Sequence, residues 1–138
     1  DLNGSSNLIF PGITYSSGLF PVVWHRNHLG IISSDKMTRS GGIYTYDFTQ
    51  AGSAYSNTNP GEKLLSGSIW GMFSGDASGG GVINTFDLTF WSPDAGSQDY
   101  LEGDFNLNSQ ADNKDKNDFW FGNLGNESQI PGSKNDDN

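Results

Sequence analysis

The most regular segment of the sequence lies in the second half of the chain and is rich in acids and asparagines. From residue 103 to residue 115 it reads Gly103-Asp104-Phe105-Asn106-Leu107-Asn108-Ser109-Gln110-Ala111-Asp112-Asn113-Lys114-Asp115. Oxygen-bearing side chains alternate here with apolar or small residues. This pattern indicates a loop whose oxygen atoms gather around a cation.

Calcium binds roughly six to eight hard oxygen ligands, and a loop of about 12 residues supplies them from its first, third, fifth, seventh, ninth and twelfth positions. In the loop that starts at Asp104 these positions hold, in order, Asp104, Asn106, Asn108, Gln110, Asp112 and Asp115. Each residue can offer oxygen, the seventh through its backbone carbonyl. Residues 113–120 are expected to form a short helix that leaves the loop. The alternative is an array of Asx turns that caps this helix without an ion.

Two positions of this loop depart from the usual pattern. The sixth position holds Ser109, where glycine normally allows a sharp turn, so we expect local backbone strain. The twelfth position holds Asp115 rather than a bidentate glutamate. Neither change removes a ligand, and the sequence predicts a calcium site here.

A weaker loop of the same kind starts at Asp76. Its six ligand positions hold Asp76, Ser78, Gly80, Val82, Asn84 and Asp87. Gly80 has no side-chain oxygen, so this loop is one ligand short unless water or a neighbouring group completes it. The alternative is a degenerate loop retained for packing. If one site is filled, it should be the loop that starts at Asp104.

Each loop is followed by a pair of aromatic residues, Phe90-Trp91 after the first and Phe119-Trp120 after the second. The pairs fall three residues after Asp87 but four residues after Asp115, so the repeat is imperfect by one position. Such a duplication predicts two loop–helix units that pack on each other through these aromatics.

The charge divides the chain at about residue 75. Acids and bases cancel in residues 1–75, so residues 76–138 carry the whole net charge of −9. A segment this acidic repels phosphate, which argues against binding of nucleic acid or of an anionic membrane. The alternatives are a solvated acidic segment and a cation site.

The first half has the texture of a β-rich segment. Runs of β-branched and aromatic residues are separated by Gly, Pro, Asn or Ser, which predicts strands at Leu8–Phe10, Leu19–Trp24, Leu29–Ile32, Ile43–Phe48 and Ile69–Phe73. Alternation within 43–48 places Tyr44, Tyr46 and Phe48 on one face of a half-buried strand. Together the strands predict a thin antiparallel β-sandwich that is incomplete, with an open edge for upstream sequence or a partner strand.

The length of 138 residues allows one domain or two very small ones. We expect a mainly β fold with a small α part: a β-sandwich-like segment over residues 1–74, a pair of calcium loop–helix units over 75–131 and a polar tail over 132–138. The chain has no cysteine, so neither disulfides nor thiolate metal sites can brace it. No segment is apolar enough for a membrane helix.

Other candidate chemistry is weak. His25 and His28 are three residues apart, a spacing that places them on opposite faces of a continuous strand, and we expect a structural role for them. Asp99 and Glu102 imitate a hydrolase acid pair, but acids are frequent enough here to fall together by chance. No Gly-x-Ser-x-Gly elbow accompanies a strand–turn–helix pattern. The sequence predicts no enzymatic activity.

Exposed aromatics offer a rival interpretation. The four tryptophans, Trp24, Trp70, Trp91 and Trp120, could include a sugar-stacking platform, which would make the chain a carbohydrate-binding module. A coplanar, solvent-facing aromatic pair would favour this hypothesis. Buried indoles would contradict it, because a small domain without cysteine needs most of its aromatics for the core.

The loops resemble type I dockerin repeats. The segment Asp112-Asn113-Lys114-Asp115-Lys116-Asn117-Asp118-Phe119-Trp120, with Ser128-Gln129-Ile130-Pro131, is similar to the closing unit of dockerin-like C-terminal regions in secreted multidomain proteins of Bacteroidota-type bacteria. The segment Val22-Val23-Trp24-His25-Arg26-Asn27-His28-Leu29-Gly30 and the motifs Gly41-Gly42-Ile43-Tyr44, Asp47-Phe48 and Trp70-Gly71-Met72 resemble the β-rich part that precedes the repeats there.

The resemblance implies an extracellular or cell-surface location, where calcium is abundant enough for weak loops with dissociation constants on the order of 10⁻⁴ to 10⁻³ M. It also implies that residues 1–4 lie inside a β-domain rather than at its start. Dockerins of the family bind cohesins, but no cohesin-facing surface can be read from this sequence. We expect a non-catalytic structural or attachment module, whose partner is another chain, the upstream part of its own protein, or further copies in an oligomer or filament.

Overall fold

The computed structural model describes Ile9 and residues 15–132 of the chain. The strands pair as three separate antiparallel hairpins: β1 (Val22–His25) with β2 (His28–Ile32), β3 (Thr38–Ser40) with β4 (Ile43–Thr45), and β5 (Lys63–Ser66) with β6 (Ile69–Gly71). Three short helical segments follow in the second half: α1 (Leu88–Asp94), the π-helix η1 (Asp115–Trp120) and the 3₁₀ turn η2 (Phe121–Asn123). A mainly antiparallel β fold with a small helical part is thus confirmed.

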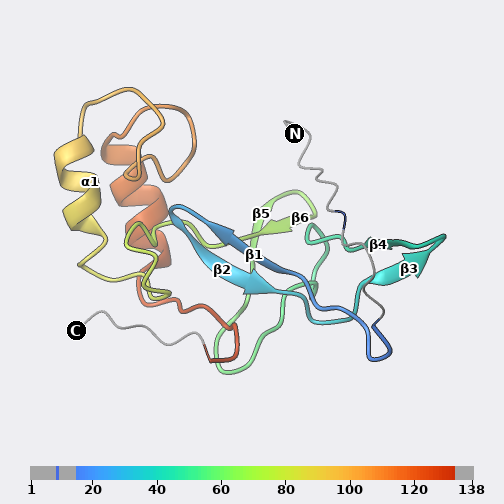
Figure 1. Ribbon diagram of the computed structural model, residues 1–138. Helices are drawn as coiled ribbons and strands as arrows, with labels where there is room; N and C mark the ends of the chain where they lie inside the picture. Colours follow the sequence, from blue (N-terminus) through green and yellow to red (C-terminus); the bar gives the residue numbers. More distant parts are fainter. Residues whose placement is uncertain (1–8, 10–14, 133–138) are drawn as a thin grey trace.

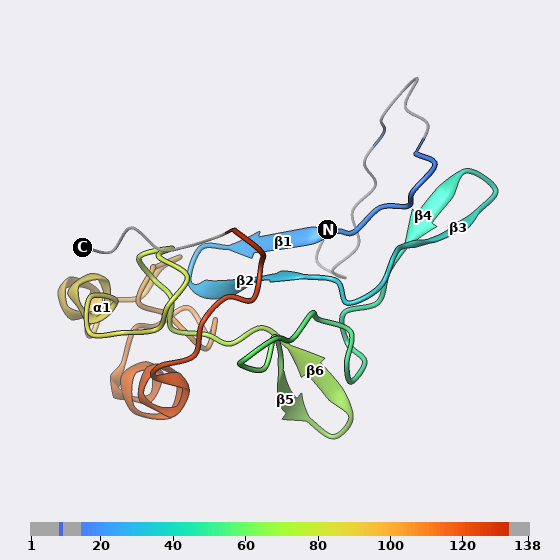
Figure 2. The same cartoon turned by 90° about the horizontal axis from the view of Figure 1, so that it is seen from below.

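The arrangement places the helices and the hairpins at different ends of the molecule. In Figures 1 and 2, α1 and η1 lie beside each other at one end, the β3–β4 hairpin projects at the other end, and β1–β2 runs between them. Within the described residues each sheet has two strands, so no packed pair of larger sheets is formed. The hairpins are local structures joined by long polar connections, such as residues 46–62.

The predicted strands agree with the structure only in part. Four of the predicted runs overlap β1, β2, β4 and β6, but β1 and β2 each include a histidine outside the predicted run, and the run from Ile43 pairs only as far as Thr45. The expected alternation extends beyond the pairing, since Tyr44, Tyr46 and Phe48 are half-buried and their neighbours are exposed. β3 and β5 were not predicted. The expected strand Leu8–Phe10 and the polar tail lie outside the described residues, apart from Ile9 and Gly132.

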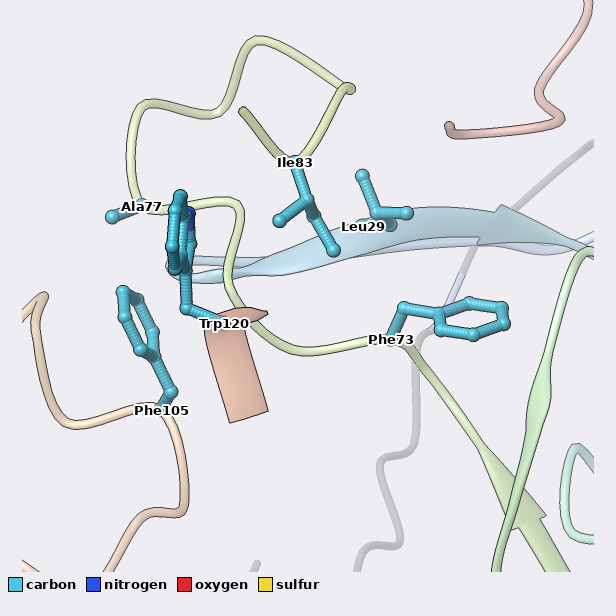
Figure 3. Packing of buried hydrophobic residues seen from close by; sticks show 6 residues of the cluster. All are labelled: Leu29, Phe73, Ala77, Ile83, Phe105 and Trp120. Atoms are coloured by element: carbon cyan, nitrogen blue, oxygen red, sulfur yellow. The ribbon is translucent and has the colours of Figure 1, made fainter. Parts of the chain in front are cut away.

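The hydrophobic core lies where β2 meets the two acidic loops. Its buried members come from both halves of the sequence: Leu29, Phe73, Ala77, Ile83, Phe105 and Trp120 (Figure 3). Leu88, Phe90, Trp91 and Phe119 pack against this cluster from the helical segments. Backbone bonds continue the contact, since Leu29 N–H donates to the Phe73 carbonyl at 2.8 Å. The change of charge near residue 75 is therefore a boundary of composition but not of packing.

No helix among the described residues is long and apolar enough to cross a membrane. Among the described residues, most of the buried charged side chains lie in the two acidic loops next to the core.

Candidate metal centre

The loop that starts at Asp104 is organised around two buried carboxylates. Asp104 is 2% exposed, and Asp115, eleven residues later, is fully buried. The Asp104 Oδ1 atom accepts a hydrogen bond from Asn108 N–H at 3.0 Å, and Oδ2 accepts one from Ser109 N–H at 2.8 Å. The first carboxylate of the loop thus holds the backbone of its fifth and sixth positions.

The last carboxylate of the loop closes it from the other side. Asp115 Oδ1 accepts from Asn106 N–H at 2.9 Å, and Oδ2 accepts from Asp112 N–H at 2.8 Å. Burial raises the pKa of Asp115, and the charges of Asp104 and Asp112 raise it further, while the backbone bonds from Asp112 and Asn106 oppose the shift. These carboxylates lie close enough to repel one another when ionised, and a cation between them would relieve that repulsion.

The remaining side chains of the loop are oriented by the backbone in the same way. Asn106 Oδ1 accepts from Asn108 N–H and Asn108 Oδ1 accepts from Gln110 N–H, both at 3.0 Å. Asp112 Oδ1 accepts from Lys114 N–H at 2.6 Å. Five of the six predicted ligand side chains thus have backbone bonds that fix their oxygens. The seventh position, Gln110, contributes its backbone carbonyl in loops of this kind.

The loop that starts at Asp76 repeats three of the backbone bonds to its first and last carboxylates. Asp76 accepts from Gly81 N–H at 3.1 Å through Oδ2, and Asp87 accepts from the N–H groups of Ser78 and Asn84 at 3.0 and 2.8 Å. The positions are the same as in the second loop: sixth to first, and third and ninth to twelfth. The Ser78 hydroxyl, however, donates to Asp87 at 2.8 Å. Gly80 has no side-chain oxygen, so this loop has fewer side-chain oxygens available to a cation than the loop that starts at Asp104.

Both loops also share an uncommon backbone shape. The fourth and sixth positions have positive φ in each: 71° at Gly79 and 78° at Gly81 in the first loop, and 60° at Leu107 and 71° at Ser109 in the second. The first loop meets this requirement with glycines, whereas the second meets it with residues that carry a Cβ and are strained there. The strain predicted at Ser109 is confirmed, and Leu107 adds a second strained position.

The two loop–helix units brace each other through their tryptophans. Trp91 Nε1–H, from α1, donates to the Asp112 carbonyl at 3.0 Å, and Trp120 Nε1–H, from η1, donates to the Asn84 carbonyl at 2.9 Å. Asn84 and Asp112 are the ninth residues of their loops. Each tryptophan therefore donates to the carbonyl at the same position of the other loop.

The backbone makes a second reciprocal contact at the eighth position of each loop. Ile83 exchanges hydrogen bonds with the segment after η2, accepting from Gly125 N–H and donating to the Asn126 carbonyl. Ala111 does the same with the segment after α1, accepting from Gly96 N–H and donating to the Ser97 carbonyl. Both residues are fully buried. The eighth residues of the two loops therefore make equivalent backbone bonds to the segment that follows the other helix.

The one-residue irregularity of the repeat is absorbed by the second helix. α1 is an α-helix, whereas η1 over Asp115–Trp120 is a π-helix, whose wider turns hold about one more residue each. Trp120 follows its loop one residue later than Trp91 does, yet both indoles reach the same position of the opposite loop. The extra residue therefore changes the helix type and preserves the pairing.

The donor set fits a hard cation. Among the described residues no three His, Cys, Asp or Glu side chains form one group close enough to hold a metal by themselves. Each loop instead combines two buried carboxylates with amide, hydroxyl and carbonyl oxygens. A carboxylate has about four lone-pair sites, and the backbone bonds described use two on each of Asp104 and Asp115. An all-oxygen set without nitrogen or sulfur matches calcium rather than zinc.

His25 and His28 are separated by a turn, so the opposite-face geometry expected for a continuous strand does not apply to them. His25 and His28 face each other across the β1–β2 turn, with ring centroids 4.5 Å apart in an edge-to-face contact. They do not lie on opposite faces, because residues 26–27 reverse the chain. Burial lowers the pKa of His28 to about 3, helped by the charges of His25 and Arg26. His28 is therefore neutral at ordinary pH.

The β1–β2 turn also contacts the second loop, which the sequence did not predict. Arg26 lies over the Tyr100 ring at 3.4 Å and donates from Nη1 to the Leu101 carbonyl, and Asn27 is completely buried against Asp104. The turn is 75 residues away in sequence, and nothing in its own composition indicates the contact. Asp99 and Glu102, the two acids that imitate a hydrolase pair, are both exposed.

The tryptophans differ in exposure. Trp120 is 7% exposed, Trp70 and Trp91 are half-buried, and Trp24 is 59% exposed. Comparison of the chain with family models, with curated proteins and with solved structures found no match. The loop geometry therefore carries the functional conclusion alone.

Proposed function

We propose that this chain is a non-catalytic, calcium-stabilised structural or attachment module, with a dockerin-like pair of calcium loops at its centre. The observation that carries the proposal is the pair of buried carboxylates, Asp104 and Asp115, held in a scaffold of backbone bonds that recurs at Asp76 and Asp87. Burial of like charges is costly without a counter-charge, and calcium supplies one. The ion fixes the loops, so folding and ion binding are coupled.

The loop that starts at Asp104 is the stronger site, with all of its ligand oxygens present. The loop that starts at Asp76 binds more weakly, because Gly80 contributes no side chain and Ser78 is engaged with Asp87. Weak loops of this kind suit an extracellular or cell-surface location, where calcium is abundant.

The module joins a larger secreted or surface assembly. Its hairpins expose many large apolar side chains, among them Val22, Val23, Leu64, Leu65 and Ile69. Such surfaces favour a partner, either another chain, the upstream part of the same protein, or further copies that complete a β-sandwich-like sheet. Size-exclusion chromatography tests this part: a well-folded monomer that recruits no partner strand would contradict it.

The central test is thermal unfolding in excess calcium and in excess chelator. At a hundredfold excess over the dissociation constant, one site stabilises the fold by about 2.7 kcal/mol, which raises Tm by on the order of 10 °C in a chain of this size. Asp104→Asn should lose most of this rise. Asp99→Asn, an exposed acid outside the loops, is the matched control and should keep it. Identical curves in calcium and chelator would refute the proposal.

Glycan binding is the second candidate, favoured by Trp24. Its ring lies across β2, close enough that a Cβ on Gly30 would meet the Cε3 and Cζ3 atoms at 2.5 Å, and the indole remains largely exposed. An exposed indole that is supported on one side by a strand can stack on a sugar ring with its other face. Affinity electrophoresis in polysaccharide gels with the wild type and Trp24→Ala tests this. Equal mobility of both proteins in every gel would remove the candidate.

A further inference from the structure

The β1–β2 turn touches the start of both ion loops through one residue. Asn27 is fully buried, and its Nδ2 donates to the carbonyls of Asp104, at 2.7 Å, and of Glu102, at 3.0 Å. Its own backbone carbonyl accepts from Gly75 N–H at 2.9 Å. Gly75 directly precedes the first ligand of one loop, and Asp104 is the first ligand of the other. Asn27 is therefore bonded to the same point in both loops.

The neighbours of Asn27 fix its orientation. His28 Nδ1 lies 2.8 Å from Asn27 Oδ1, so a neutral His28 with its proton on Nδ1 directs the amide nitrogen toward the loop. On the other side, the Arg26 guanidinium is held over Tyr100 and bonded to Leu101, just before the second loop. The turn is thus held against residues 100–104 by one cation–π contact and three hydrogen bonds.

The contact continues into β2. Leu29 belongs to the core with Ile83 and Phe105, which lie inside the first and the second loop (Figure 3). Beyond the turn, His28 also forms a backbone bridge with Ser74. The hairpin cannot move away from the loops without exposing this core and leaving the amide of Asn27 without partners.

We propose that Asn27 couples ion binding in the two loops to the order of the β1–β2 hairpin, so that the hairpin and both loops gain stability in one step. This inference rests on the proposed calcium binding. An ion draws the first ligands of the loops into position, and Asn27 bonds to the backbone at those positions. Stabilisation of the loops therefore stabilises the turn, and with it a hairpin that contains none of the ligands.

Hydrogen exchange of the β2 amides, measured with calcium chloride and with chelator, reads this coupling directly. Full coupling predicts that exchange at Leu29–Ile31 slows by about a hundredfold at a hundredfold excess of calcium over its dissociation constant. The β3–β4 amides, in a hairpin distant from the loops (Figure 1), should slow much less. Calcium affinity is measured in parallel by calorimetry on the full chain.

Asn27→Ala removes the donor to Asp104 and Glu102 and should weaken calcium binding about tenfold, the effect of one lost buried hydrogen-bonding group. It should also reduce the effect of calcium on β2 exchange. Asn27→Asp, which keeps the acceptor toward His28 but sets a carboxylate against two carbonyls, should do the same. Asn57→Ala, an exposed asparagine, is the matched control and should behave as the wild type.

The outcomes separate the two proposals. If the wild type binds calcium but β2 exchange does not respond, the coupling is refuted and the proposed function stands. The coupling is equally refuted if the Asn27 variants fold and bind calcium with unchanged affinity. If the wild type binds no calcium, both proposals fail. Should the variants not fold, the wild-type exchange experiment decides by itself.

Discussion

Ser109 occupies a backbone conformation that suits glycine. Its φ of 71° matches the 78° of Gly81 in the first loop. Ser109→Gly should therefore stabilise the fold by about 0.5–1 kcal/mol. Glycine removes the strain of the left-handed conformation, and its greater freedom in the unfolded chain offsets part of that gain. Urea unfolding measures the change. Ser109→Ala keeps the strain and removes only the hydroxyl, so an equal gain from alanine would contradict this explanation.

His28 makes stability depend on pH. Its pKa falls from 6.5 in the unfolded chain to about 3 in the folded protein, so the unfolded state binds more protons between these values. The contribution of His28 is complete above pH 6.5 and decreases as the pH falls toward 3, with a slope of up to about 1.4 kcal/mol per pH unit.

Urea unfolding between pH 7 and pH 4.5 measures this dependence. The upper part of this window lies above the usual range of carboxyl titration, so the histidines dominate there. His28→Gln keeps a donor for Asn27 but does not titrate, and its stability should fall less steeply over the window. Parallel curves for the wild type and the variant would show that His28 is not the group responsible.

At the scale of single residues, the sequence predicted the loops but not what supports them. The candidate positions could be named because calcium loops fix both residue types and spacing. In the structure, Asp104 and Asp115 accept hydrogen bonds from backbone N–H groups of the same loop. Whether calcium binds them stays a prediction. The role of Asn27 could not be found, because the carbonyls that its amide binds, of Glu102 and Asp104, are more than 70 residues away and its neighbours in sequence indicate only a turn.

Gly103 and α1 show how closely the units approach one another. A Cβ at Gly103 would lie 2.9 Å from the Trp91 Cα, which belongs to the backbone and cannot rotate away. Gly75 has the equivalent contact with the Trp120 Cα at 3.2 Å. Gly103→Ala should destabilise the fold by about 1–3 kcal/mol through overpacking. Gly122→Ala, with no atom within 4 Å, is the control and should change stability little.

Thermal and urea unfolding of these two variants tests the approach of the units. A Gly103→Ala protein as stable as the wild type would mean that α1 and the second loop can separate without cost. That result would also argue against close packing of the two loop–helix units, because the Trp91 indole bond requires the same close approach.

At the scale of elements, strands rich in β-branched or aromatic residues were predicted, and β3 and β5, which are poor in them, were not. β4 was predicted because its half-buried tyrosine alternates with exposed neighbours. β3 is exposed throughout and β5 has two adjacent leucines, so neither has a period of two. The offset of one residue between the repeats was visible in the sequence, but its consequence, a π-helix in place of an α-helix, required the structure.

For the whole molecule, the net charge of −9 offers a test that separates binding from screening. Salt of any kind weakens repulsion among exposed acids, whereas a calcium site acts at low concentration and saturates. Calcium at a few millimolar, on the order of the affinity of extracellular loops, should raise Tm more than sodium chloride of equal ionic strength. Magnesium should be weaker than calcium, since it needs a tighter octahedral site.

Melting curves in matched-ionic-strength buffers provide this measurement. Asp104→Asn should remove the calcium-specific part and leave the general salt effect. If all three salts raised Tm equally at equal ionic strength, charge screening would explain the result and the loops would have no specific ion.

The sequence predicted a composition boundary near residue 75 but not how the two halves pack. Leu29 and Phe73, from the neutral half, share a core with Ile83 and Phe105 from the acidic half. A boundary in charge reflects what the surface carries, whereas packing depends on contacts between residues far apart in sequence. The predicted β-sandwich could not be judged from strand content alone, because pairing into three separate hairpins uses the same residues.

The reciprocal bonds of Trp91 and Trp120 mean that each loop–helix unit helps to fix the loop of the other. The peptide link between them, at the exposed residues Asp99 and Tyr100, adds proximity but none of the indole or eighth-position contacts. We expect the two fragments of a chain cut at this link to remain associated, because the indole and eighth-position bonds do not pass through it.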